Sequence, residues 1–253
     1  MTHKIRVVAP FRPFPPEAPH HQELAAFDWM DAIEMLSRSV QLSCGVPVQI
    51  LTDADTELPC ATLQYATTQR RLMLWSLEVS ACYLESDDFD RDTISLDCDQ
   101  LVYQNLARWF STGAGLGLLY RTHPPKGDAA SFPILNGVQW WALRAKSALA
   151  AFYRRALEVA ETLPEEQIVW GADTTALVRL LEPLEVGIIY RAGLTVHLID
   201  SSEVIRALST VDIRHLESGR WFMPLPAVLD FRNLRKPYMR PVFDATIGAA
   251  MTS

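Results

Sequence analysis

Two carboxylates, two residues apart, directly follow a short apolar run in the first half of the chain. The segment Thr93–Leu96 has the composition of a strand, and Asp97 and Asp99 come immediately after it. Side chains at positions i and i+2 of an extended chain point the same way, so both carboxylates can face one point. Two carboxylates at close range repel each other unless a cation lies between them. The pattern predicts a site for a hard divalent cation, Mg²⁺ or Mn²⁺, which would also bind the phosphates of a ligand.

A second chemically capable segment lies near the end of the chain, at Asp230–Tyr238 (DFRNLRKPY). It carries a carboxylate at Asp230 and an ammonium at Lys236, which is followed by proline and an aromatic residue. A carboxylate is a good ligand for a hard cation, and a lysine ammonium is a compact partner for phosphate. The alternative interpretation is a basic surface loop, just as an isolated Asp-x-Asp is also common at strand ends and in turns.

Together these two segments resemble the Asp-x-Asp and His-x-x-Gly-x-x-Lys-Pro-Trp motifs of the glycogenin-like and lipopolysaccharide galactosyltransferase-like glycosyltransferases, which have the GT-A fold. The resemblance implies that Asp97, Asp99 and Asp230 ligate the metal, and that Asp97 and Lys236 contact the diphosphate of a donor. Two residues depart from the motif, because Asp230 stands in place of the His and Asn233 in place of the Gly. Asn is the next most tolerant residue for a positive φ, so the loop geometry can survive the second change.

Two shorter stretches extend the resemblance to the sugar side of the site. Asn136, followed by Gly137, is similar to a Phe-Asn-x-Gly-Val stretch of the family, with one residue fewer before the Val. Asp173 is similar to the Asp of an Asp-Gln pair at a helix start, with Thr174 departing from the Gln. The resemblance implies that Asn136 and Asp173 are catalytic residues that contact the donor sugar. The alternatives are an Asn-Gly turn and a helix N-cap.

Strand and helix patterns alternate in the first half, which implies an α/β fold with a mostly parallel sheet and helices on both faces. The resemblance implies that this sheet is GT-A-like (Rossmann-like). The last forty residues read as loop-rich. Ligands of such sheets bind beyond the carboxyl ends of the strands. The expected strands are 5–9, 46–51, 93–96, 115–120, 132–135, 186–190 and 194–199. The expected helices are 21–42, 67–84, 101–110, 144–162 and 173–181.

The nucleotide of a donor is expected beyond the first strand. The end of that strand, at Val8, Ala9 and Pro10, would line the base and ribose, and Arg70 or Arg71 would approach the nucleotide or its phosphates. One of these arginines would otherwise pair with acidic neighbours.

The length of 253 residues suits a single domain, with a nucleotide-binding half at 1–110 and a sugar and acceptor half at 111–253. The formal charge of −7 argues against non-specific binding to nucleic acid, which depends on neutralising phosphates. The four cysteines form no Cys-x-x-Cys pair, and no apolar stretch approaches the roughly 18 residues of a membrane span. No hydrophobic signal core is evident at the start, so we expect a cytoplasmic location.

The resemblance implies a metal-dependent glycosyltransferase that uses a nucleoside-diphosphate sugar, with a UDP-sugar favoured, and retains the anomeric configuration. Its acceptor is a glycan, a protein, a small molecule or, least favoured by the charge, a nucleic acid. One alternative is a sugar nucleotidyltransferase, although the segment Pro10–Pro15 lacks the Gly-rich loop typical of that class. The other is a non-catalytic binding or assembly protein on a degenerate transferase fold, which the two departures at Asp230 and Asn233 permit.

Overall fold

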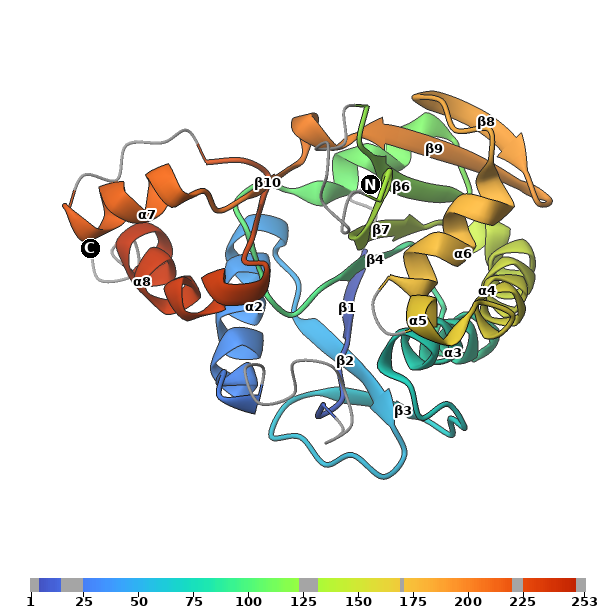
Figure 1. The fold of residues 1–253 in the computed structure, drawn as a ribbon, viewed down its shortest axis with the longest axis horizontal. Coiled ribbons are helices and arrows are strands. Elements are labelled where there is room, and N and C mark those ends of the chain that lie inside the picture. Colours follow the sequence, from blue (N-terminus) through green and yellow to red (C-terminus); the bar gives the residue numbers. More distant parts are fainter. Residues whose placement is uncertain (1–4, 15–24, 123–131, 169–170, 220–224, 249–253) are drawn as a thin grey trace.

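Eleven strands form two sheets in the computed structural model, which describes residues 5–14, 25–122, 132–168, 171–219 and 225–248. The strands are β1 (Arg6–Pro10), β2 (Val48–Asp53), β3 (Thr62–Tyr65), β4 (Thr93–Leu96), β5 (Gln100–Val102), β6 (Leu116–Tyr120), β7 (Ile134–Trp141), β8 (Gly187–Arg191), β9 (Leu194–Asp200), β10 (Ile205–Ala207) and β11 (Val228–Asp230). The large sheet has the order β3-β2-β1-β4-β7-β6-β9-β8, and the small sheet has the order β10-β11-β5 (Figure 1). Only β7 and β8 run against the other strands of the large sheet. The predicted mostly parallel sheet is therefore confirmed.

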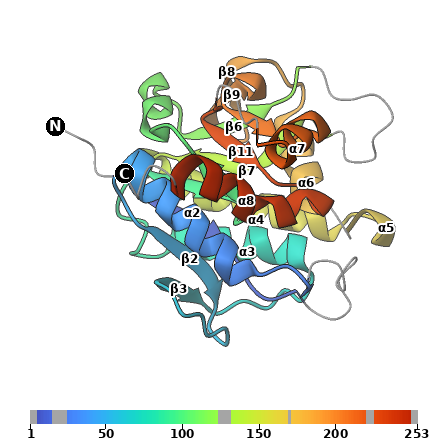
Figure 2. The ribbon, with the colours of Figure 1, turned by 90° about the vertical axis from the view of Figure 1, so that its left-hand side faces the viewer.

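Helices cover both faces of the large sheet, as predicted. They are α2 (Trp29–Cys44), α3 (Leu72–Glu85), α4 (Lys146–Glu161), α5 (Glu165–Ile168), α6 (Ala172–Leu181), α7 (Thr210–Glu217) and α8 (Met239–Phe243). In Figure 1, α3, α4 and α6 lie together on one side of the strands, and α2 and α8 lie on the other, where Figure 2 views them from the front. No helix of the described residues is both long and apolar enough to cross a membrane.

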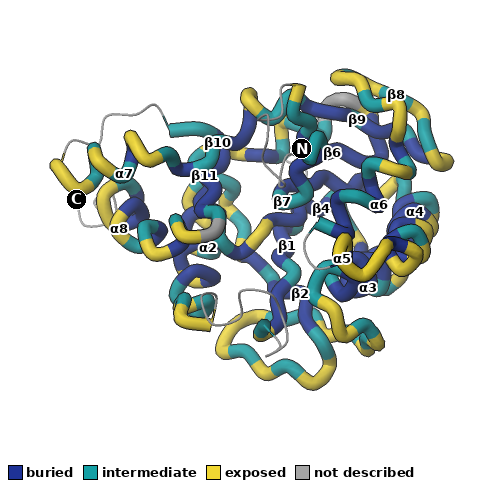
Figure 3. Tube along the Cα trace, viewed as in Figure 1, coloured by how far each residue is buried: buried dark blue, intermediate teal, exposed yellow. Residues whose placement is uncertain are grey.

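Alternating strand residues supply the two cores between the sheet and its helices. Val8 packs into the core under α3, α4 and α6, whereas Val7 and Ala9 pack into the core under α2. The same alternation sends Trp141 to the first core and Trp140 to the second, as expected when successive side chains point to opposite faces. The central strands are consequently buried along their length (Figure 3), and the strand ends that follow them are fixed in place.

Several predicted elements differ from the structure. The helix expected at 21–42 begins at Trp29, with Asp28 as its N-cap, and its expected first residues lie partly outside the described ranges. The helix predicted at 101–110 is wrong, because its residues form β5 and then the 3₁₀ helix η1 (Leu106–Thr112). Pairing with β11, which is far away in the sequence, overrides the local helical pattern there. The strand expected at 132–135 continues to Trp141, and Asn136-Gly137 lies inside it instead of forming a turn.

The loop-rich prediction for the last forty residues also needs correction. Their described part contains β11, the 3₁₀ helix η4 (Asn233–Tyr238), α8 and a short π-helical turn, η5 (Asp244–Gly248). Apolar residues of α8 pack with Leu101 of β5 and Ala32 of α2 in a third cluster. The C-terminal segment thus has a core of its own beside the large sheet.

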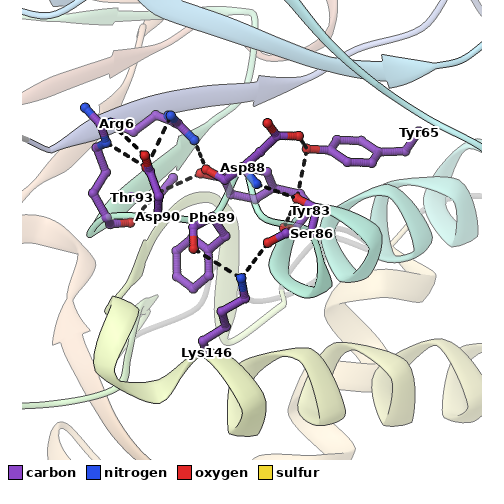
Figure 4. Close-up of polar contacts among 10 residues, drawn as sticks. Arg6, Tyr65, Tyr83, Ser86, Asp88, Phe89, Asp90, Thr93 and Lys146 are labelled. Atoms are coloured by element: carbon purple, nitrogen blue, oxygen red, sulfur yellow. Dashed lines mark hydrogen bonds and ion pairs between the residues drawn. The ribbon is translucent and has the colours of Figure 1, made fainter.

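A set of polar contacts fixes the loop that enters β4 at the edge of the sheet opposite Asp97 (Figure 4). The Arg6 guanidinium forms an ion pair with Asp90 at 3.3 Å. Lys146 Nζ, from α4, donates to the carbonyl oxygens of Ser86 at 2.5 Å and Phe89 at 3.4 Å, and the first of these carbonyls follows the end of α3. These contacts determine where β4 starts and hence where its carboxyl end, with the Asp-x-Asp pair, must lie.

We predict that Ser39→Ala destabilises the protein measurably. The buried Ser39 hydroxyl of α2 donates to the Leu36 carbonyl at 2.8 Å and accepts from the Val102 backbone N–H of β5 at 3.1 Å. Without it, a buried N–H loses its partner, which costs about 1–3 kcal/mol. At roughly 2–4 °C per kcal/mol for a chain of this size, the change should be evident in thermal unfolding.

The matched control is Ser43→Ala, one turn further along α2. Its hydroxyl donates to backbone carbonyls of its own helix, the nearer being that of Ser39 at 2.8 Å, and is only partly buried. Its effect should stay within about 0.5 kcal/mol. Equal shifts in Tm for both variants would contradict the role assigned to Ser39 in holding β5.

Candidate functional site

The Asp-x-Asp pair follows β4 at the carboxyl edge of the large sheet, close to β7. The Asp97 backbone N–H donates to the carbonyl of Gly137 at 3.0 Å. A Cβ at Gly137 would lie 2.5 Å from Asp97 Oδ2 and 2.7 Å from Gln100 Nε2. The Asp97 and Gln100 side chains thus lie against the backbone of β7, and any larger residue at position 137 would require them to shift.

Asp230 reaches the same place through the small sheet. It lies opposite Gln100 in the antiparallel pairing of β11 with β5, and the backbone N–H of Phe231 donates to the Asp99 carbonyl at 3.0 Å. Asp230 is buried, with 3% of its surface exposed. The structure therefore brings Asp230 together with Asp97 and Asp99, as the sequence predicts.

The electrostatics of the site arise from burial and from repulsion between carboxylates. Desolvation, followed by the charges of Asp230 and Asp173, raises the pKa of Asp97 to about 6. Desolvation is also the main cause of the raised pKa values of Asp230 and Asp173. The Asp97 side chain is exposed, so its carboxylate meets solvent although protein atoms surround it closely enough to desolvate it.

Two cations compensate these carboxylates. Lys236 of η4 forms an ion pair with Asp99, and its ammonium lies 4.9 Å from the centroid of the Trp29 ring. Burial lowers the pKa of Lys236 to about 8, an effect that the charge of Asp97 opposes. Arg232 forms an ion pair with Asp230. No sequence pattern indicates these roles of Arg232 and Trp29, although Arg232 lies within the segment Asp230–Tyr238.

The ligand atoms of Asp97, Asp99 and Asp230 suit a hard divalent cation, since all three residues offer carboxylate oxygens and a cation would relieve the repulsion that Asp97 experiences from Asp230. The three side chains are not, however, arranged around a common point. In the described ranges, no group of three or more His, Cys, Asp or Glu side chains is arranged to hold a metal ion. Asp99 and Asp230 are each paired with a cationic side chain, so metal binding requires these two ion pairs to open.

Asn136 and Asp173 lie beside this cluster and contact each other. Asn136 Nδ2 donates to Asp173 Oδ2 at 2.7 Å, and the Thr174 backbone N–H donates to Asp173 Oδ1 at 2.7 Å. The N-cap of α6 is Gly171, at φ 74°, so the N-cap interpretation of Asp173 is wrong and the residue lies in the first turn. Its buried carboxylate is near enough to Asp97 to raise that residue's pKa.

The residues expected at the nucleotide are less clearly arranged. Val8 and Ala9 are fully buried in the two cores, and only Pro10 is partly exposed at the end of β1. Arg71 pairs with Glu165 of α5, the alternative foreseen for one of the two arginines. The Arg70 carbonyl accepts a hydrogen bond from Arg12.

The sequence analysis also missed Arg12, a buried arginine just beyond β1. Its guanidinium lies 3.6 Å from an Asp53 carboxylate oxygen and 5.1 Å from the centroid of the Trp75 ring. Its signal was an arginine between prolines directly after a strand that was expected to bind a ligand. Arg12 ties the end of β1 to the loop before α3.

No protein-family model and no curated protein matches the sequence. Solved structures do match. One is a glycosyltransferase involved in the glycosylation of the major capsid of PBCV-1 (TM-score 0.54, 11% identity, 93% of this chain and 98% of that chain). Another is an active-site mutant of LgtC (0.56, 12%, 96% and 95%), and a third is GlyE of Streptococcus pneumoniae TIGR4 (0.54, 13%, 93% and 57%). At such identities the likeness concerns the fold alone, and the predicted GT-A fold is confirmed.

We predict that the stability of Asp97→Asn, measured relative to that of the parent protein, increases as the pH rises. With a folded pKa of about 6 against an ordinary value of 3.8, Asp97 adds stability below pH 4 that is lost as the pH rises through 6. Asparagine does not titrate. The Tm of the variant minus that of the parent, measured with a chelator present, should therefore increase between pH 4 and 7 and then level off.

Asp244→Asn is the control for this series, because Asp244 is an exposed carboxylate of η5. Its Tm difference, measured in the same series, gives the effect of replacing a carboxylate outside the site. A difference for Asp97→Asn that stays constant across the series would mean that Asp97 titrates like a solvated carboxylate, contrary to its position among buried acids.

Proposed function

We propose that this chain is a glycosyltransferase that transfers a sugar from a nucleoside-diphosphate sugar, with a UDP-sugar favoured, to an acceptor. One observation carries the proposal. Asp97, Asp99, Asp230 and Lys236, which the sequence motifs single out, meet at the carboxyl edge of the sheet beside the hydrogen-bonded Asn136 and Asp173. Among the proteins of the same fold, a galactosyltransferase, LgtC, was crystallised with donor and acceptor sugar analogues. That complex supports a hexose donor here.

We propose that the activity depends on Mn²⁺ or Mg²⁺ held by Asp97, Asp99 and Asp230. When bound, such an ion supplies Lewis-acid stabilisation to the diphosphate. The support from this chain is the gathering of three carboxylates, of which Asp230 adds to the desolvation that raises the pKa of Asp97. The pairing of β11 with β5 brings Asp230 to Asp99, and carboxylate oxygens are the ligands that these ions prefer.

Lys236 and Arg232 are the residues that would bind the diphosphate. Both are already near the carboxylates, and Lys236 is buried against Trp29, which limits its motion. With a pKa of about 8, the ammonium of Lys236 is largely protonated at neutral pH. A positive charge placed where negative charge grows on the leaving diphosphate stabilises the transition state more than the ground state.

The donor sugar would lie against Asn136 and Asp173. Asp173 offers carboxylate oxygens to sugar hydroxyls, and Asn136 holds that carboxylate by a 2.7 Å hydrogen bond. Retention of the anomeric configuration follows from the family resemblance alone. The base and ribose would lie beyond Pro10. Of the two candidate arginines we propose Arg70 for the nucleotide, because Arg71 pairs with Glu165.

A second candidate function is a non-catalytic binding protein on the same fold. The ion pairs of Lys236 with Asp99 and of Arg232 with Asp230 favour it, since they satisfy two of the proposed ligands without a metal. In both cases we propose a cytoplasmic location, for which the support is the four cysteines, all of them free thiols.

We predict that UDP and Mn²⁺ together raise the Tm, and that neither alone has the same effect. A ligand at 100 times its Kd adds about 2.7 kcal/mol, which is several degrees at roughly 2–4 °C per kcal/mol. Asp97→Ala and Asp230→Ala should abolish the joint shift, as measured by thermal unfolding across a panel of nucleoside diphosphates and nucleotide-sugars.

Asp244→Ala, which removes an exposed carboxylate that pairs only loosely with Arg240 at 3.7 Å, should keep the full shift. If no nucleotide raises the Tm, with or without metal, the transferase proposal fails. A nucleotide shift without any release of UDP from UDP-sugars would favour the binding protein instead.

A further inference from the structure

We infer that Gln139, oriented by the Trp141 indole, is a positioning residue that fixes the direction of the hydrogen bond from Asn136 to Asp173. The part that Asp173 plays toward a sugar rests on the proposed function, whereas the positioning itself is a property of the folded chain. Neither Gln139 nor Trp141 belongs to the motifs that singled out the site.

The direction of the hydrogen bonds starts at Trp141, whose indole N–H can only donate. It donates to Gln139 Oε1 at 3.1 Å and to the Tyr153 hydroxyl at 2.9 Å. The Tyr153 hydroxyl in turn donates to Gln139 Oε1. Two donors therefore converge on one end of the Gln139 amide, which must be its oxygen.

The orientation of Gln139 determines that of Asn136. Gln139 Nε2 faces away from Trp141 and donates to Asn136 Oδ1 at 2.6 Å and to the Asn136 carbonyl at 3.0 Å. With its oxygen occupied, Asn136 presents its NH₂ group to Asp173 Oδ2 at 2.7 Å. Asp173 is thus restricted to accepting at this oxygen, and its Oδ1 already accepts from the Thr174 N–H.

The strand geometry explains how Asn136 and Gln139, three residues apart, meet at all. Strict alternation along β7 would put them on opposite faces of the sheet. The pairing of β6 with β7 shifts, however: Leu118 lies opposite Gln139 and the next residue, Leu119, lies opposite Leu135. Residues 136–138 form a bulge, and a bulge re-aims side chains.

Burial makes the order of these bonds consequential. Trp141, Tyr153, Gln139 and Asp173 are all buried, so water cannot take the place of a lost partner. Desolvation raises the pKa of Asp173, and the bonds from Asn136 and Thr174 oppose that rise. A reversed Asn136 amide would set an oxygen against the carboxylate. Gln139 prevents this reversal, so Asp173 Oδ2 keeps accepting from Asn136 Nδ2.

The test compares Gln139→Glu with Tyr153→Phe. Glutamate keeps an oxygen for Trp141 and Tyr153, but as a carboxylate it cannot donate to Asn136, so the Asn136 amide is expected to turn. Tyr153→Phe removes one of the two donors to Gln139 Oε1 and leaves Trp141 in place, so the amide orientation should persist. The side-chain ¹⁵N–¹H resonances of Asn136 report the outcome without any substrate.

When Asp173→Asn is made alone, the Asn136 side-chain resonances should move, because the NH₂ group loses its carboxylate partner. When Asp173→Asn is added to Gln139→Glu, the resonances should stay in place, because the turned Asn136 NH₂ group no longer donates to residue 173. With UDP-glucose or UDP-galactose and Mn²⁺, Gln139→Glu should lower kcat for UDP release about tenfold or more while the donor KM changes by about threefold or less. Tyr153→Phe should stay within about threefold in both.

The two readouts separate the inference from the proposed function. If the unchanged protein releases no UDP from either sugar nucleotide, the proposed function fails, and the Asn136 resonances still decide the positioning. If Gln139→Glu leaves the response of those resonances to Asp173→Asn intact, the inference is overturned. A loss of the response in a folded Gln139→Glu protein supports it.

Discussion

Repulsion between desolvated carboxylates is the constraint around which this structure is organised. Four aspartates, Asp97, Asp99, Asp173 and Asp230, lie at or near the carboxyl edge of the large sheet, and three of them have raised pKa values because burial disfavours their charge. Such a cluster is stable only if other groups hold it. The small sheet holds Asp230 against Asp99, and the two cationic side chains of the C-terminal segment compensate both.

Rigid elements carry each of these groups, although the site joins segments from the whole chain. The loop before β4 is held by the polar contacts of Figure 4, and β5 pairs with β11 beneath α2. Helix α6 follows Gly171, which has a positive φ. Two residues of the bulge in β7, Asn136 and Gly137, contact different aspartates of the site. Gly137 leaves room for the Asp97 carboxylate on one side, and Asn136 turns toward Asp173 on the other. Without the bulge, Asn136 and Gln139 would point to opposite faces of the sheet and could not meet.

The sequence predicted the local parts of this arrangement and missed the parts that depend on distant pairing. β4 and its two aspartates were found because an apolar strand pattern and a turn are encoded within a few residues. The local pattern of residues 101–110 predicts a helix, because no neighbouring residue indicates that β5 pairs with β11. Asn136-Gly137 suggested a turn, since the reason for the glycine is a carboxylate forty residues earlier. A single arginine such as Arg232 does not indicate in the sequence which carboxylate it will pair with.

The ion pairs of Lys236 with Asp99 and of Arg232 with Asp230 make the site electrically self-contained. An anion that draws away the two cationic side chains leaves two carboxylates exposed to each other. A cation that takes the carboxylates frees the lysine and the arginine. An anion or a cation that binds alone must supply the free energy needed to separate both ion pairs. When both bind, that free energy is spent only once. Anion and cation therefore strengthen each other's binding by the same factor, a reciprocity that thermodynamic linkage requires.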